Sequence, residues 1–255
     1  MPSVLVRRSA VLLLALLPFS TLRAFEGPPQ GVPPDDALIL LAAGNQRYAD
    51  DKPLHFQQNS LRRSETAKHG QKPFAVVLTC ADSRVPPELI FDQGVGCLFV
   101  IRVAGNVSRV DEVASIEYAV GHLGTRLVVV MGHTRCGAVS AVVEEAHAGP
   151  NLAELIAPIQ PAAKRARAEN PGLHGPGLVD ATVRTNVLQS MADLLRLSPE
   201  LSLAVAVGRA RVVGAIYDLE SGKVEMLDHV AVPQPANAPA PGTPPAPVEA
   251  PPAHH

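Results

Sequence analysis

Two short apolar runs constrain the fold most, because both end abruptly in side chains that can bind a metal ion. Residues 76–79 read VVLT and lead into residues 80–84, CADSR. Residues 127–131 read LVVVM and lead into residues 132–137, GHTRCG. Short runs rich in β-branched residues are typical of buried strands. Ligands bind beyond the carboxyl ends of the strands in open parallel sheets, so we expect the two polar segments to meet there.

The residue types in these segments favour a catalytic zinc site. If the two runs are neighbouring parallel strands, Cys80, His133 and Cys136 converge at one edge of the sheet. Two thiolates and one imidazole, with a fourth position free, are the ligand set of a catalytic zinc site, whereas a structural site has four protein ligands. A lone histidine or cysteine is usually a packing residue. Cys136 differs because it lies at the start of a predicted helix, where the helix dipole favours a thiolate.

Asp82 and Arg84 are open to three interpretations. They could form a structural ion pair that holds the loop. Asp82 could instead be the fourth zinc ligand and close the site. In the third interpretation, Arg84 holds Asp82 away from the metal, so that the carboxylate accepts a hydrogen bond from a zinc-bound hydroxide. Arginine suits this role because its planar guanidinium can grip a carboxylate by two parallel hydrogen bonds.

The order of predicted elements indicates a doubly wound α/β fold with a mainly parallel central sheet, flanked by helices. One domain is expected at residues 36–232, without internal repeats. We predict strands at residues 74–79, 98–103, 127–131, 212–218 and 223–227. We predict helices from Asp35 or Asp36 to residue 48, and at residues 60–69, 86–91, 111–123, 137–147, 152–170 (split by prolines), 178–197 and from 198 onward.

The two ends of the chain differ from this domain. Residues 1–24 resemble a signal peptide, with paired arginines before an apolar run that is too short to span a bilayer. Residues 25–35 form a connector rich in proline and glycine, and residues 233–255 form a tail of mostly proline and alanine that we expect to be disordered. We therefore expect a periplasmic or secreted protein with no membrane contact after signal cleavage. Metal binding would protect two of its three cysteines from oxidation, and we expect Cys97 to be a small buried apolar residue.

The composition argues against nucleic acid as a partner. The net charge is −2 and the chain has no tryptophan. Binding to nucleic acid or to an anionic membrane needs a basic patch, and base stacking needs aromatic side chains. Hydrophobic content of 47% and charged content of 18% fit a globular protein with a large core.

The two polar segments, CADSR and GHTRCG, resemble the paired zinc motifs of the β-class carbonic anhydrases. The resemblance covers roughly residues 36–228. Four further segments are similar to the family: residues 40–48, 98–106, 115–120 and 213–218.

The resemblance implies one Zn²⁺ per subunit, bound by Cys80, His133 and Cys136. Its fourth position would alternate between water and Asp82, the latter only in a closed state. The implied reaction is the reversible hydration of carbon dioxide to bicarbonate and a proton, by attack of zinc-bound hydroxide. Asp82, oriented by Arg84, would position that hydroxide.

The resemblance also implies a homodimer or tetramer, in which Gln71 contacts substrate in the partner's site. Some family members bind bicarbonate at a regulatory site made by tryptophan, arginine and tyrosine. Arg102 and Tyr118 match two of these positions, but Val77 stands where the tryptophan would be, so we expect no such site. Two alternatives share the metal site: a hydrolase of carbonyl sulfide or carbon disulfide, and a non-catalytic protein that binds zinc or bicarbonate.

Overall fold

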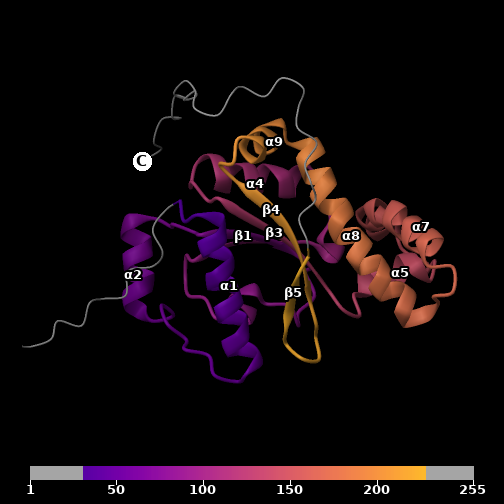
Figure 1. The fold of residues 1–255 in the computed structure, drawn as a ribbon, viewed down its shortest axis with the longest axis horizontal. Coiled ribbons are helices and arrows are strands. Elements are labelled where there is room, and N and C mark those ends of the chain that lie inside the picture. Colours follow the sequence, from indigo (N-terminus) through magenta and orange to yellow (C-terminus); the bar gives the residue numbers. More distant parts are fainter. Residues whose placement is uncertain (1–30, 228–255) are drawn as a thin grey trace, which may run out of the picture.

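The central element is a five-stranded sheet with the strand order β2-β1-β3-β4-β5 (Figure 1). The computed structural model describes residues 31–227, so the predicted signal peptide, most of the connector and the proline-rich tail lie outside the described residues. β1 to β4 are parallel and β5 is antiparallel to β4. The predicted α/β class with a mainly parallel sheet is confirmed. The strands are β1 (Ala75–Thr79), β2 (Leu98–Arg102), β3 (Leu127–His133), β4 (Arg211–Tyr217) and β5 (Val224–Met226).

The helices connect and cover these strands. They are α1 (Pro34–Ala49), α2 (Ser60–His69), α3 (Pro87–Ile90), α4 (Val110–Gly121), α5 (Gly137–Val143), α6 (Pro150–Ile156), α7 (Gln160–Glu169), α8 (Gly175–Leu197) and α9 (Pro199–Ala206), with short 3₁₀ segments at Ala104–Asn106 and Ala157–Ile159. Within residues 31–227, no helix combines the length and the hydropathy that crossing a bilayer requires.

Several helix ends differ from the sequence prediction; α8, for example, begins at Gly175 rather than at residue 178. Neither Asp35 nor Asp36 caps α1: the helix begins at Pro34, no side chain caps it, and Asp35 forms an ion pair with Arg211 instead. α5 was expected to reach residue 147 but ends at Val143, because Glu145 adopts a left-handed backbone with φ of 53°. The predicted split of the 152–170 helix at its prolines is confirmed, since proline lacks the N–H that a continuous helix needs.

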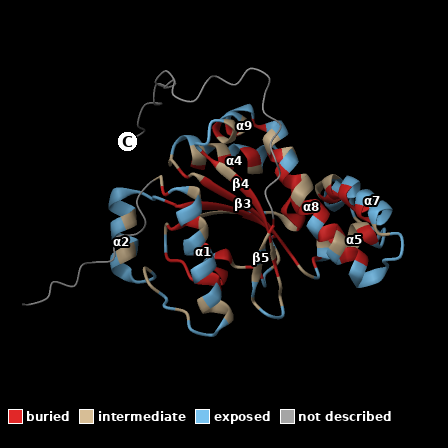
Figure 2. Ribbon diagram, in the orientation of Figure 1, coloured by how far each residue is buried: buried red, intermediate tan, exposed pale blue. Residues whose placement is uncertain are grey.

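Side-chain alternation along the strands gives the sheet two buried faces (Figure 2). Val77 and Val129 belong to one apolar cluster, which α1 covers through Leu41. Their neighbours Val76 and Val128 belong to the opposite cluster, with residues of α4, α8 and α9. Figure 1 shows α1 on one side of the sheet and α4, α8 and α9 on the other. The sheet is therefore a rigid central layer on which loops can be positioned.

A third apolar cluster lies around the carboxyl ends of β1 and β3. It includes Cys80 and Cys136 together with residues of α5, α7 and α8. β3 and α8 approach so closely there that a Cβ on Gly132 would lie 2.8 Å from Val187 and 3.0 Å from Val183. Glycine at this position lets the end of β3 pass close to α8 and brings the next residue, His133, to the edge of the sheet.

Candidate metal centre

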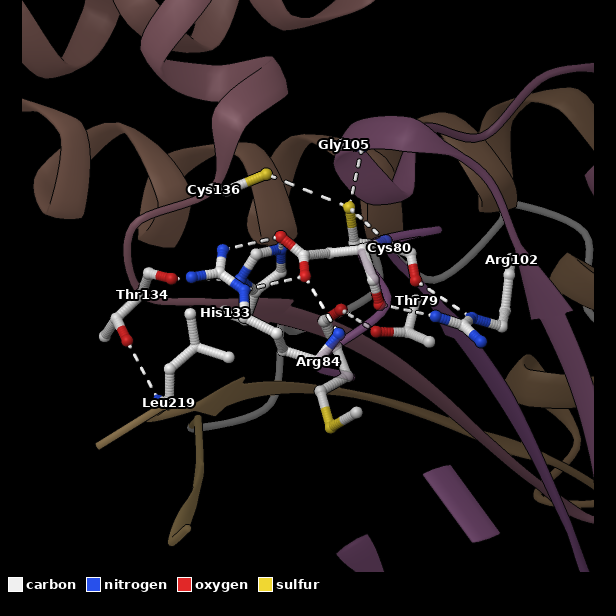
Figure 3. Close-up of polar contacts among 11 residues, drawn as sticks. Thr79, Cys80, Arg84, Arg102, Gly105, His133, Thr134, Cys136 and Leu219 are labelled. Carbon is white, nitrogen blue, oxygen red and sulfur yellow. Dashed lines mark hydrogen bonds and ion pairs between the residues drawn. The ribbon is translucent and has the colours of Figure 1, made fainter. Parts of the chain in front are cut away.

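Three potential ligands converge at the carboxyl edge of the sheet, as the sequence predicts (Figure 3). Cys80 directly follows β1, His133 is the last residue of β3, and Cys136 is the residue before α5. Their ligand atoms all lie within 4.8 Å of one another, and the two Sγ atoms are 3.9 Å apart. All three residues are buried. Pairing of β1 with β3, which aligns Thr79 with Met131, brings the first ligand to the other two.

Hydrogen bonds to the two cysteine sulfurs shift their pKa values in a way that favours binding of a cation. The hydrogen bond with Cys136 lowers the pKa of Cys80 to about 4, against the opposing effect of burial, and backbone N–H groups of Gly105 and Asp82 contribute at 3.4 Å. The same bond to Cys80 raises the pKa of Cys136. One of the two sulfurs donates to the other, and a cation bound between them would displace that proton. Gly105 presents its N–H from a left-handed backbone with φ of 75°, a conformation that glycine adopts without strain.

His133 presents one ring nitrogen to the same space. Its Nδ1 lies 2.9 Å from the carbonyl oxygen of Thr134. A carbonyl oxygen only accepts, so Nδ1 carries the proton and Nε2 has a free lone pair. Nε2 is buried and has no hydrogen-bond partner among the described residues. Buried polar atoms are rarely left unpaired, so this orphaned nitrogen, together with two thiols, fits a metal ion of the zinc type.

The Asp82 carboxylate borders this group and is gripped by Arg84. Nε of Arg84 donates to Oδ1 at 2.9 Å and Nη2 donates to Oδ2 at 2.7 Å. The hydrogen bonds from Arg84 hold the pKa of Asp82 well below its ordinary value. Oδ2 lies 3.9 Å from Nε2 of His133. This ion pair agrees with the first and the third interpretations, and it leaves an ionised acceptor beside the three potential ligands.

Comparison with known proteins identifies the family. The carbonic anhydrase family model matches residues 75–224, a span that contains all three potential ligands. Carbonic anhydrase 2 of Mycobacterium tuberculosis is 37% identical over 201 residues, covering 77% of this chain and 94% of the relative. The solved β-carbonic anhydrase CcaA is 30% identical with a TM-score of 0.60, covering 75% of this chain and 95% of that one. A tetrameric β-carbonic anhydrase of Sordaria macrospora is 25% identical with a TM-score of 0.59, covering 75% and 97%.

The chain belongs to the β-class carbonic anhydrases. The resemblance noted in the sequence is thereby confirmed.

In this carbonic anhydrase, Arg102 has a role that the sequence analysis missed. It is the last residue of β2, and its Nε donates to the carbonyl oxygen of Cys80 at 3.1 Å while Nη2 donates to that of Asp82. Arg102 therefore holds the loop that carries a potential ligand and the carboxylate. The feature that could have revealed this role is the position of Arg102 at the end of the strand beside β1, in register with Thr79.

The sequence analysis compared two further residues, Val77 and Tyr118, with a regulatory bicarbonate site that we expect to be absent. Val77 is fully buried within β1. Tyr118 is half-exposed on α4, and its ring lies 5.4 Å from that of His122 and 6.2 Å from that of Phe99.

Gln71 and Cys97 lie away from the ligand group of this carbonic anhydrase. Gln71 is exposed and precedes the amino end of β1, whereas Cys80 follows its carboxyl end. Its predicted contact with substrate was assigned to a partner's site and stays a prediction. Cys97 is fully buried, as predicted, and its thiol donates to Oε1 of Gln57 at 2.9 Å.

Proposed function

We propose that this protein catalyses the Zn²⁺-dependent, reversible hydration of carbon dioxide to bicarbonate and a proton. Membership of the carbonic anhydrase family supports this reaction. The single observation that carries the metal dependence is the convergence of Cys80, Cys136 and the orphaned Nε2 of His133. One zinc ion per subunit is proposed, since this group offers one set of ligands.

The proposed zinc ligands are Cys80 Sγ, His133 Nε2 and Cys136 Sγ. Sulfur and imidazole nitrogen are ligands that zinc prefers, and three protein ligands leave a position for solvent. Bound zinc would supply a nucleophile at neutral pH, because it lowers the pKa of a coordinated water to about 7. All three side chains are buried, Cys80 and Cys136 within an apolar cluster, and this burial keeps bulk water from competing for them.

Asp82 would orient the nucleophile. Its carboxylate stays ionised because Arg84 grips it, and an ionised carboxylate only accepts hydrogen bonds. The carboxylate would accept a hydrogen bond from the nucleophile that bound zinc supplies, and would so hold it in one orientation toward carbon dioxide. The two Arg84 hydrogen bonds also compete with any metal for the same carboxylate, so we propose that the gripped state is the active one and that a state with Asp82 on zinc is closed.

We also propose a homodimer or tetramer. The Sordaria macrospora relative is tetrameric according to its description. α1 exposes Ile39 and Leu40, with 65% and 38% of their surfaces accessible, and an apolar helix face of this kind is a common subunit contact. In such an assembly, Gln71 of one subunit would contact carbon dioxide or bicarbonate bound to its partner.

Export to the periplasm or beyond remains our proposal from the sequence of residues 1–24. Cell fractionation of the tagged full-length chain tests it. Retention of uncleaved protein in the cytoplasm would overturn it.

The test of the proposed function is zinc content together with stopped-flow hydration of carbon dioxide. We expect one zinc per chain, rapid hydration, loss of activity on chelation, and recovery on adding Zn²⁺. Purified protein that binds no zinc, or that releases sulfide from carbonyl sulfide without hydrating carbon dioxide, would contradict the proposal.

A further inference from the structure

The loop that carries two of the proposed ligands is tied to the hairpin turn between β4 and β5, residues 218–223. Thr134 makes the connection. Its backbone N–H donates to the carbonyl of Tyr217 at 3.0 Å, and its hydroxyl donates to Oδ2 of Asp218 at 3.2 Å. The same hydroxyl accepts the N–H of Leu219 at 3.1 Å, a contact that Figure 3 shows beside His133. Both hydrogen-bonding functions of one hydroxyl are therefore used, and both partners belong to the turn.

Asp218 is itself fixed by the turn. Its Oδ1 accepts the N–H of Ser221 at 2.7 Å and the hydroxyl of Ser221 at 2.6 Å. The carboxylate thus has one oxygen held within the turn and the other directed at Thr134. This arrangement makes Asp218 a stationary acceptor, rather than a flexible surface side chain.

The connection matters for His133 because Thr134 also provides the carbonyl that binds Nδ1 of this histidine, at 2.9 Å. A contact that holds the Thr134 carbonyl in place therefore also restrains the orientation of the His133 ring and favours the tautomer in which Nε2 is free. The backbone of this loop needs support, since Arg135 has φ of 56°, a left-handed conformation that is unfavourable for a residue with a side chain. Hydrogen bonds to a metal-binding histidine generally tune the metal affinity of the site.

We propose that Thr134 and Asp218 are positioning residues for His133: the Thr134 hydroxyl, held by Asp218 and Leu219, fixes the carbonyl that orients the imidazole toward the metal. This inference rests on the proposed zinc site. It assigns a role in metal binding to a turn 84 residues further along the chain.

The experiment compares three threonine variants of the full chain. Thr134→Val keeps the branched shape and removes the hydroxyl, whereas Thr134→Ser keeps the hydroxyl. Thr125→Val is the matched control: Thr125 precedes the opposite end of β3, and its buried hydroxyl donates to the carbonyl of Pro73 at 2.9 Å. Zinc affinity is measured by competition with a chelator, and thermal unfolding is measured on the metal-free proteins.

We expect Thr134→Val to bind zinc roughly 10- to 100-fold more weakly, which is the usual effect of losing a residue that orients a ligand. Thr134→Ser should restore most of that affinity. Thr125→Val should lower the unfolding temperature of the metal-free protein and leave zinc affinity unchanged. Equal zinc affinity of Thr134→Val and Thr125→Val would overturn the proposal, because it would reduce Thr134 to a structural residue.

Asp218→Asn is a second variant, for use if Thr134→Val does not fold. It keeps the shape of the side chain, and we expect it to bind zinc more weakly than the wild type. The double variant Thr134→Ser/Asp218→Asn should bind zinc at most a few-fold more weakly than Asp218→Asn alone. Wild-type zinc affinity in Asp218→Asn would also overturn the proposal. The proposed function fails separately, since in that case the wild-type protein itself binds no zinc.

Discussion

Two aspartate–arginine pairs in this molecule have similar chemistry and different surroundings. Asp82 is gripped by Arg84 beside the three potential metal ligands, and Asp92 accepts Nε of Arg47 at 2.6 Å. Arg84 lowers the pKa of Asp82. Burial raises the pKa of Asp92, but hydrogen bonds from Leu54, Arg47 and other donors outweigh it, so that this pKa is also below its ordinary value.

The two aspartates differ in what lies on the side of the carboxylate that faces away from the arginine. Asp92 is 2% exposed, and it also accepts the backbone N–H groups of Leu54 at 3.0 Å and His55 at 3.2 Å. Donors from this chain reach both carboxylate oxygens, so Asp92 holds the loop after α1 against the end of α3. Asp82 has its arginine on one side and the unpaired Nε2 of His133 at 3.9 Å on the other. An ion pair becomes a candidate for chemistry when it leaves an acceptor free beside other unsatisfied groups.

The largest expected effect is on the activity of Asp82→Asn. An asparagine amide donates as well as accepts hydrogen bonds, so it would not orient the hydroxide as the carboxylate does. We expect the hydration rate to fall roughly 100-fold while zinc content stays near one per chain. Stopped-flow hydration and metal analysis measure the two quantities. Full activity in this variant would remove Asp82 from the mechanism and make the two aspartates equivalent.

Asp92→Asn is expected to change stability instead of activity. Replacing a buried ionised acceptor of three hydrogen bonds should cost about 2 kcal/mol of unfolding free energy, or roughly 30-fold in the unfolding equilibrium. Chemical denaturation of the metal-free protein measures this cost. A hydration rate that fell as far as in Asp82→Asn would contradict the division of roles.

The same variant should change the pH dependence of stability. Since the pKa of Asp92 is lowered in the folded protein, its contribution is fully present above the unfolded pKa of about 4 and is lost as the pH falls through the lower folded value. We therefore expect wild-type stability to decline more steeply below about pH 4 than that of Asp92→Asn. Denaturation curves at several pH values test this, and parallel declines would show that Asp92 is not linked to acid unfolding.

Arg84→Lys should have the smallest effect. Lysine keeps the positive charge but cannot make two parallel hydrogen bonds, so the carboxylate stays ionised and loses its fixed orientation. We expect roughly 10-fold slower hydration, with zinc content and thermal stability close to wild type. A loss as large as that of Asp82→Asn would instead indicate that the fork itself, and not the carboxylate alone, is required.

Much of this molecule follows from patterns within short segments. The strand-like runs at 76–79 and 127–131 predicted the two central strands, and the rule on carboxyl ends of parallel strands predicted that Cys80, His133 and Cys136 would meet. Prolines predicted the split of the 152–170 helix and the start of α9. These features are local, or depend only on sheet topology.

The supporting hydrogen bonds were not predictable in the same way. The sequence analysis noted Arg102 only as a match to one position of a bicarbonate site that we expected to be absent, yet its guanidinium donates to the carbonyls of Cys80 and Asp82. Thr134 and Asp218 are 84 residues apart, and Asp92 and Leu54 are 38 apart. Such contacts depend on the spacing of neighbouring elements to within an ångström, and no periodicity in the sequence encodes that spacing. The helix cap assigned to Asp35 or Asp36 was also wrong: no side chain caps α1, and Asp35 pairs with the distant Arg211.

The alignment of β1 with β3 has a consequence for the order of folding and metal binding. His133 and Cys136 are close in the chain at every stage, whereas Cys80 and Cys136 are 56 residues apart. Thr79 must lie opposite Met131 before the first cysteine reaches the other two residues. A slip by one position would turn that cysteine to the opposite face of the sheet. If zinc binds these three residues as proposed, its uptake requires the correct pairing of β1 with β3, so the zinc content of a preparation would report that pairing.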